Sequence, residues 1–177
     1  ACGCLSLLSA LTSVRCLTAE QYPLLSEILA KCLAVPENPD FLQSVFALIG
    51  DAAGVCVELV VPVLDAAIRS LLDHLASDLG DNVAVNALWA MGQLAARYPV
   101  SPESANRAAS IMVQTMTTKN YPTRAYLDNQ VVALGRCLCR VDMPVVDLSP
   151  VLARWSRLIS LIAEDGERSA AVEGFLL

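Results

Sequence analysis

Hydrophobic and polar residues follow one another along the chain with the period of amphipathic helices, in which residues i, i+3, i+4 and i+7 share a face. The pattern predicts helices over residues 4–17, 19–34, 40–53, 59–77, 81–98, 102–117, 123–141, 148–163 and 166–177. Proline and capping residues mark several boundaries: Asp40 follows Pro39, and Ser101 precedes Pro102. No long linker interrupts the pattern, so we expect a single domain over residues 1–177.

A short motif recurs in alternate helices. The segments Phe46-Ala-Leu-Ile-Gly50, Leu88-Trp-Ala-Met-Gly92 and Val131-Val-Ala-Leu-Gly135 all end in glycine, and a weaker copy ends at Gly174. Successive glycines are 42, 43 and 39 residues apart. A period of about 40 residues built from helix pairs is typical of HEAT and armadillo solenoids. Glycine inside a helix costs about 1 kcal/mol relative to alanine. We therefore expect each glycine to lie where its helix approaches the paired helix closely.

The repeat predicts an all-α fold: an α-solenoid of HEAT repeats with about four helix pairs plus a half-repeat. The inner helices that carry the glycine motif are predicted at residues 40–53, 81–98, 123–141 and 166–177, and the helix over residues 4–17 is an inner helix that forms the half-repeat. The outer helices are predicted at residues 19–34, 59–77, 102–117 and 148–163. Stacked repeats of this kind present their inner helices along an extended concave binding face.

The inner helices carry a stripe of polar residues around one tryptophan. Asn86, Trp89 and Gln93 share a face of the helix over residues 81–98, and Asp51, Asn129 and Arg136 occupy the neighbouring inner helices. A tryptophan among amide and charged groups suits a peptide-binding hot spot, because it offers a large apolar area at low entropic cost. The six residues form the predicted binding site.

Structural explanations compete with each of these assignments. Trp89 could belong to the core, since large apolar side chains are usually buried. Asn86 and Asn129 could bond the backbone of the neighbouring repeat, forming an asparagine ladder, because buried amides are normally paired. Asp51 and Arg136 could be solvated surface charges, which contribute little to binding.

Composition limits the classes of function. Charged residues make up 17%, hydrophobic residues 55%, and the mean hydropathy is +0.53, which suggests a segment of a longer protein whose ends pack against further repeats. No apolar window is long enough to span a membrane, so we expect no membrane insertion. The net charge of −6 and the scattered basic residues argue against direct nucleic-acid binding and favour a basic partner.

The residues of catalysis and metal binding are sparse. Seven cysteines, an odd number, lie mostly within apolar helical patterns, which is typical of buried reduced thiols. The spacing Cys-x-Cys places Cys137 and Cys139 on different faces of a helix, and His74 is the single histidine. We therefore expect no metal, no cofactor and no enzymatic activity.

Three inner-helix segments resemble consecutive segments of the transportins, a branch of the importin-β superfamily of karyopherins. They are Leu42-Gln-Ser-Val-Phe-Ala-Leu-Ile-Gly-Asp51, Val85-Asn-Ala-Leu-Trp-Ala-Met-Gly-Gln93 and Leu127-Asp-Asn-Gln-Val-Val-Ala-Leu-Gly-Arg136. The segments Pro150-Val-Leu-Ala-Arg-Trp155 and Asp165-Gly-Glu-Arg-Ser-Ala170 are similar to the family's next outer helix and the start of its next inner helix. The chain departs from the family at Val85, where an asparagine is typical, at Gln93, where a glutamate is typical, and at Ser6 and Ser13, where acidic residues are typical.

The resemblance implies a piece of the C-terminal cargo-binding arch of a nuclear import receptor. Such receptors shuttle between cytoplasm and nucleus, bind proline–tyrosine nuclear localisation signals on the concave face, and contact the Ran GTPase and nucleoporins elsewhere. It implies that Trp89 contacts an apolar cargo residue, that Asp51 faces the basic part of the signal, and that Asn86 and Asn129 bond its backbone. The alternative function is a HEAT-repeat scaffold subunit of a phosphatase or vesicle-coat complex that binds protein partners.

Overall fold

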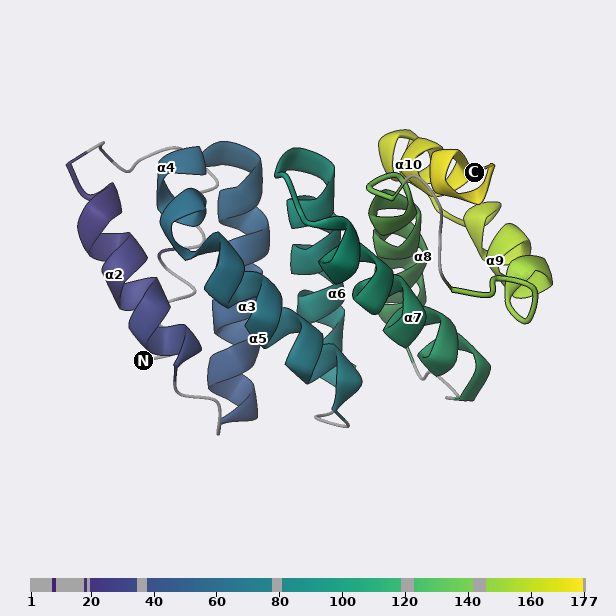
Figure 1. The fold of residues 1–177 in the computed structure, drawn as a ribbon, viewed down its shortest axis with the longest axis horizontal. Coiled ribbons are helices and arrows are strands. Elements are labelled where there is room, and N and C mark those ends of the chain that lie inside the picture. Colours follow the sequence, from purple (N-terminus) through teal and green to yellow (C-terminus); the bar gives the residue numbers. More distant parts are fainter. Residues whose placement is uncertain are drawn as a thin grey trace.

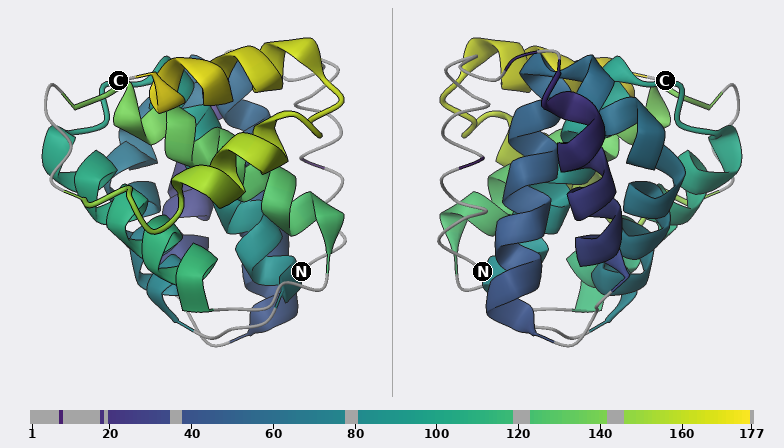
Figure 2. Two further views of the ribbon diagram at one scale, coloured as in Figure 1. Left: turned by 90° about the vertical axis from the view of Figure 1, so that its right-hand side faces the viewer. Right: turned by 90° about the vertical axis from the view of Figure 1, so that its left-hand side faces the viewer.

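A computed structural model describes residues 8, 18, 20–34, 38–77, 81–118, 123–141 and 146–176 (Figures 1 and 2). The predicted inner helix over residues 4–17 lies outside this part, apart from the helical Leu8. In chain order the elements are α2 (Tyr22–Leu33), α3 (Pro39–Val55), α4 (Val57–Val60), the 3₁₀ helix η1 (Val61–Val63), α5 (Leu64–Ala76), α6 (Asp81–Arg97), α7 (Pro102–Thr118), α8 (Arg124–Leu138), α9 (Leu152–Ile159) and α10 (Asp165–Phe175).

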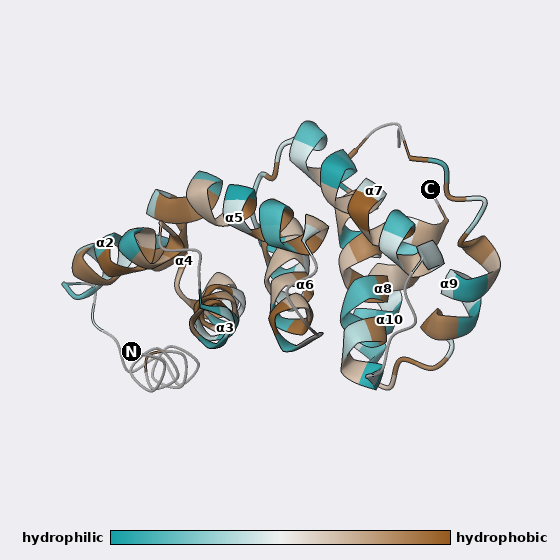
Figure 3. Cartoon of the chain, turned by 90° about the horizontal axis from the view of Figure 1, so that it is seen from below, coloured by the Kyte–Doolittle hydropathy of each residue, from teal (hydrophilic) through white to brown (hydrophobic). Residues whose placement is uncertain are grey.

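The helices form two layers. One layer contains α3, α6, α8 and α10, which contact one another in that order and which we call the inner helices. The other layer contains α2, α5, α7 and α9, each packed on the inner helix that follows it in the chain. Figure 3 shows α5 and α7 on one side of the array and α3, α6 and α8 on the other. No strand occurs among the described residues, and the predicted all-α solenoid of helix pairs is confirmed.

Capping explains where several helices begin. The side-chain oxygen of Asn38 accepts a hydrogen bond from the Phe41 amide at 3.2 Å, and α3 begins at Pro39. The Thr123 hydroxyl accepts one from the Tyr126 amide at 3.3 Å at the start of α8. Each bond satisfies an amide that has no partner within the helix.

Two predicted outer helices are shorter or more broken than expected. The helix over residues 59–77 is divided into α4, η1 and α5, because Pro62 donates no backbone hydrogen bond and the chain tightens to a 3₁₀ turn there. The helix over residues 148–163 begins only at Leu152, after Pro150, and ends at Ile159. The side chains of Arg124 and Arg168 donate to the carbonyls of residues 161–163 after the helix ends. These carbonyls are therefore satisfied without a longer helix.

The recurring glycines lie at contacts between inner helices. A Cβ on Gly92 would lie 3.3 Å from Ala133 of α8, and one on Gly135 would lie 2.7 Å from the Ala170 carbonyl oxygen of α10. The close approach was predicted, but the expected partner was wrong: each of these glycines lies against the next inner helix and not against the outer helix that is paired with its own helix. Gly50 likewise lies against Trp89 of α6.

Side chains link each inner helix to the preceding one. The amide nitrogen of Asn86 donates to the Gln43 carbonyl of α3 at 3.2 Å, and that of Asn129 donates to the Val85 carbonyl of α6 at 3.0 Å. The asparagine ladder, considered above as an alternative role for Asn86 and Asn129, is therefore present. At the other end of α8, the Arg140 guanidinium donates to the carbonyls of Ala95 and Ala96, which lie in the last turn of α6.

Asn129→Ala is expected to lower the free energy of unfolding by about 1 kcal/mol, because it removes one partly buried hydrogen bond between α8 and α6. Urea unfolding of the full chain measures this. Gln114→Ala, on the exposed side of α7, is the matched control and should change stability by less than about 0.5 kcal/mol. Equal effects of the two variants would show that the bond between repeats adds no stability.

The core lies between the two layers. It contains Phe46, Leu88, Met91, Leu134 and Trp155, each at most 1% exposed. No helix in the described part of the chain is both long enough and apolar enough to cross a membrane.

Candidate functional site

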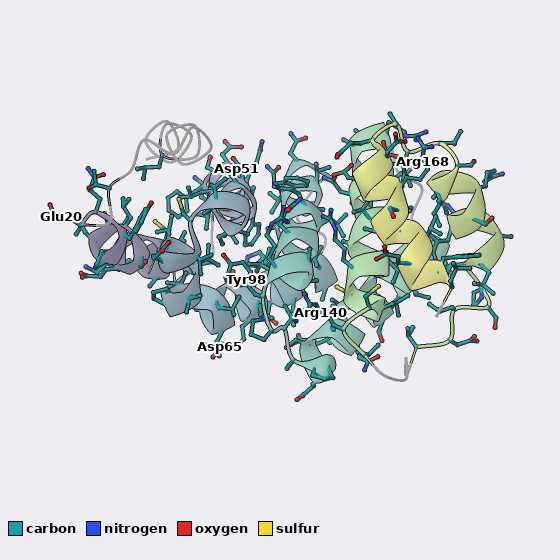
Figure 4. The ribbon with its side chains drawn as sticks, turned by 90° about the horizontal axis from the view of Figure 1, so that it is seen from above. Glu20, Asp51, Asp65, Tyr98, Arg140 and Arg168 are labelled. Carbon is teal, nitrogen blue, oxygen red and sulfur yellow. The ribbon has the colours of Figure 1, made fainter. Side chains whose placement is uncertain are left out.

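A depression of about 280 Å³ opens on the inner helices. Its lining comes from α3, α6, α8 and the start of α10, so it crosses the whole inner layer. Four of the six predicted site residues line it: Asp51, Trp89, Gln93 and Arg136. Figure 4 shows Asp51 on the side of the array opposite Asp65 of α5. Larger depressions of about 520 and 510 Å³ adjoin α2 and contain none of the predicted residues.

Trp89 is half-buried and lies against the α3 backbone. A Cβ on Gly50 would lie 2.5 Å from the Trp89 Nε1 atom, so only glycine leaves room for the ring in this position. The ring is therefore held between two helices while part of its surface remains open. Its neighbours on α6, Leu88 and Met91, point into the core and are at most 1% exposed. The prediction that Trp89 lies outside the core agrees with this placement.

Gln93 is buried and orients an arginine that the sequence analysis did not select. Its side-chain oxygen accepts a hydrogen bond from the Arg97 guanidinium one turn later. The Arg97 guanidinium lies 3.9 Å from the position of a Cβ on Gly54 of α3. Gly50 and Gly54 are four residues apart and face α6 through Trp89 and Arg97, respectively. Gly50 thus allows the Trp89 ring to lie close to α3, whereas Arg97 lies beside Gly54 at an ordinary contact distance.

Arg136 lies half-buried against α6, where its guanidinium is 3.6 Å from the position of a Cβ on Gly92. Burial lowers the pKa of Arg136, Glu167 opposes this shift, and the positive charge of Arg97 adds to it. Burial raises the pKa of Glu167, as does the nearby Glu164, while Arg136 acts in the opposite direction. Acidic and basic groups therefore share the C-terminal part of the depression.

Asn86 and Asn129 lie on the same inner helices but do not line the depression. Both are half-buried, and each uses an amide hydrogen for the ladder described above. The second amide hydrogen and the carbonyl oxygen of each side chain are not used by these bonds. The structure thus brings together four predicted residues and places the two asparagines beside them.

Sequence reasoning missed Arg97, Glu164 and Glu167, which also line the depression. Arg97 continues the stripe of Gln93 by one helical turn, so the helical period contains the signal that would have found it. Glu164 directly precedes α10 and Glu167 lies in its first turn. Residue spacing along α10 carries no information about which residues of α8 lie beside it. Their approach to Arg136 follows from the packing of α10 on α8.

His74 and Cys137 do not line the depression. The His74 ring stacks edge-on against Phe46, and its Nδ1 atom lies 2.5 Å from the Ser70 carbonyl oxygen. Burial raises the pKa of the Cys137 thiol to about 12. No group of three or more histidine, cysteine, aspartate or glutamate side chains in the described ranges is arranged to hold a metal ion.

Sequence comparisons with curated proteins identify three relatives. Transportin-1 of Oryza sativa subsp. japonica is 29% identical over 158 residues, which are 85% of this chain and 17% of that protein. Importin subunit beta-2 of Schizosaccharomyces pombe is 24% identical over 161 residues, which are 90% of this chain and 18% of that protein. Transportin of Dictyostelium discoideum is 27% identical over 157 residues, which are 86% and 16% of the two chains.

The chain is transportin-like in sequence. The resemblance inferred from the inner-helix segments is therefore confirmed, and it extends over most of the chain. No family model matches the sequence. This transportin-like chain spans about a sixth of the length of the relatives it matches. The similarity therefore concerns one stretch of each relative.

Proposed function

We propose that this chain is part of a nuclear import receptor and that the depression at Trp89 binds the nuclear localisation signals of cargo proteins. The observation that carries the proposal is the position of Trp89. Its half-exposed ring lies in a depression lined by four consecutive inner helices, and the sequence around it resembles transportins. A partly exposed aromatic anchor surrounded by polar groups is typical of interaction hot spots.

The bound signal is an extended peptide of the proline–tyrosine type that crosses the inner helices. Trp89 packs on an apolar residue of the peptide. Asn86 and Asn129 offer their remaining amide and carbonyl groups to its backbone, as extended peptides require. Asp51, at the α3 end of the depression, attracts a basic residue. Gln93 acts through Arg97, which it orients, and Arg136 supplies a positive charge at the α8 end.

The remaining activities of the receptor belong to other parts of the longer protein. Ran GTPase and nucleoporins bind there, and the receptor shuttles between cytoplasm and nucleus. Cargo binding on the inner helices requires no cofactor and no catalysis, because recognition by packing and hydrogen bonding is sufficient for a carrier.

Fluorescence anisotropy of labelled peptides tests the proposal. A peptide that carries a basic segment and an apolar residue and ends in proline–tyrosine should bind the full chain with saturable affinity. A peptide of the same composition in scrambled order should bind at least about tenfold more weakly, which corresponds to about 1.4 kcal/mol. Equal affinity for both peptides would exclude signal recognition and would favour a general scaffold role.

A further inference from the structure

Two arginines lie in the middle of the depression, between acidic residues at its two ends. Arg97 of α6 and Arg136 of α8 both line it, with Asp51 on α3 to one side and Glu164 and Glu167 beside α10 on the other. An extended peptide that crosses the inner helices therefore meets negative, positive and negative surroundings in turn.

The two guanidiniums are held in place by their surroundings. Arg97 donates to the buried Gln93, and Arg136 lies against Gly92. Burial lowers the pKa of Arg136, Glu167 opposes this shift and the positive charge of Arg97 adds to it, so the two guanidiniums are close enough to repel each other. Neither arginine belongs to an ion pair within 4 Å formed by two residues of the described ranges. An anion placed between them would reduce the repulsion.

We infer that Arg97 and Arg136 together bind an acidic side chain of the peptide ligand. The inference rests on the proposed function, because it assigns a charge preference to one position of that peptide. A guanidinium presents paired N–H donors that match the two oxygens of a carboxylate, and such charge-assisted bonds are stronger than neutral ones. Oriented donors also lose little freedom when the ligand binds.

The order of charges defines a probe peptide. Neighbouring packed helices are about 8–10 Å apart. A peptide in the extended polyproline II conformation advances about 3.1 Å per residue with three residues per turn, so side chains three residues apart share a face and meet successive helices. The probe is a fluorescent peptide in which lysine, phenylalanine, glutamate and lysine occur at intervals of three residues among glycines and serines. The lysines face Asp51 and the α10 glutamates, phenylalanine faces Trp89, and glutamate faces the arginines.

Replacement of the probe's glutamate by glutamine should weaken binding to the full chain about fivefold, the upper range for a single partly exposed ion pair. In Arg97→Gln and Arg136→Gln, the glutamate and glutamine peptides should bind with nearly equal affinity. Arg107→Gln is the control, because Arg107 lies on α7 and pairs with Asp73 at 2.9 Å, away from the depression. This variant should retain the preference for glutamate.

The outcomes separate the inference from the proposed function. If the glutamate and glutamine peptides bind the unchanged chain equally while Trp89→Ala still weakens binding, the inference is wrong and the site at Trp89 stands. If Trp89→Ala also leaves the affinity unchanged, both the inference and the proposed function are wrong. A preference for glutamate that survives in both Arg97→Gln and Arg136→Gln assigns the anion to other residues and also overturns the inference.

Discussion

Gly135→Ala is expected to lower the free energy of unfolding by about 3 kcal/mol, near the upper range of typical overpacking effects. The added Cβ would lie 2.7 Å from the Ala170 carbonyl oxygen and 2.8 Å from the Ala171 Cα atom. Both are backbone atoms of α10, so relief requires that the two helices separate. Because domains are stable by only about 5–15 kcal/mol, the loss should be evident in urea unfolding of the full chain.

Other glycines of the inner helices provide a graded set of controls. A Cβ on Gly54 would meet only the Arg97 side chain at 3.9 Å, so Gly54→Ala should raise stability by up to about 1 kcal/mol through helix propensity. Gly92→Ala, with Ala133 at 3.3 Å, should fall between Gly54→Ala and Gly135→Ala. A loss of stability that does not follow this order would contradict the packing of the inner helices.

Gly174 tests whether α8 and α10 share one contact. A Cβ on Gly174 would lie 2.6 Å from the Gly135 carbonyl carbon, so the two glycines occupy the same crossing. After either substitution has separated α8 from α10, the second substitution should lower the free energy of unfolding by less than it does alone. The double variant should therefore be less destabilised than the sum of the single variants, because residues in contact are not additive.

The glycines also show how far the sequence could predict the fold. Their period indicated a helix-pair solenoid, and the cost of glycine in a helix indicated a close neighbour. The identity of that neighbour was predicted incorrectly, because helical periodicity shows which residues share a face and not which element covers it. Contacts such as Gly135 with Ala171 join residues from successive repeats, and only the stacking of the repeats determines them.

Helical periodicity indicated which residues of one helix share the candidate site, but not which residues of other helices join them. The phase of Trp89 relative to Leu88 and Met91 indicated that its ring lies outside the core, as the structure places it. The acidic residues at the α10 end of the depression were not predictable, because the positions of Glu164 and Glu167 depend on how α10 packs on α8. The asparagines were left between two roles because an amide side chain serves a neighbouring carbonyl and a ligand equally well.

Trp89→Ala is expected to weaken binding of the proline–tyrosine peptide at least about tenfold, because truncation of a central aromatic anchor typically costs about 2 kcal/mol or more. Trp89→Phe should retain part of the affinity, since a smaller ring still fills the space against α3. Gly50→Ala offers an independent route to the same loss: its Cβ would lie 2.5 Å from the Trp89 Nε1 atom and would move the ring without removing it.

Tryptophan fluorescence can follow this residue alone. The chain contains two tryptophans, and the second, Trp155, is fully buried with no hydrogen-bond partner for its Nε1 atom in the described part of the chain. Trp155→Phe therefore removes a buried, unpaired donor and should leave a folded protein in which Trp89 is the single tryptophan. Bound peptide should shift its emission to shorter wavelength and protect it from iodide quenching, because the ring leaves water. Unchanged emission at a peptide concentration that saturates anisotropy would place the peptide away from Trp89. Unchanged affinity in Trp89→Ala, with helicity and unfolding midpoint preserved, would lead to the same conclusion.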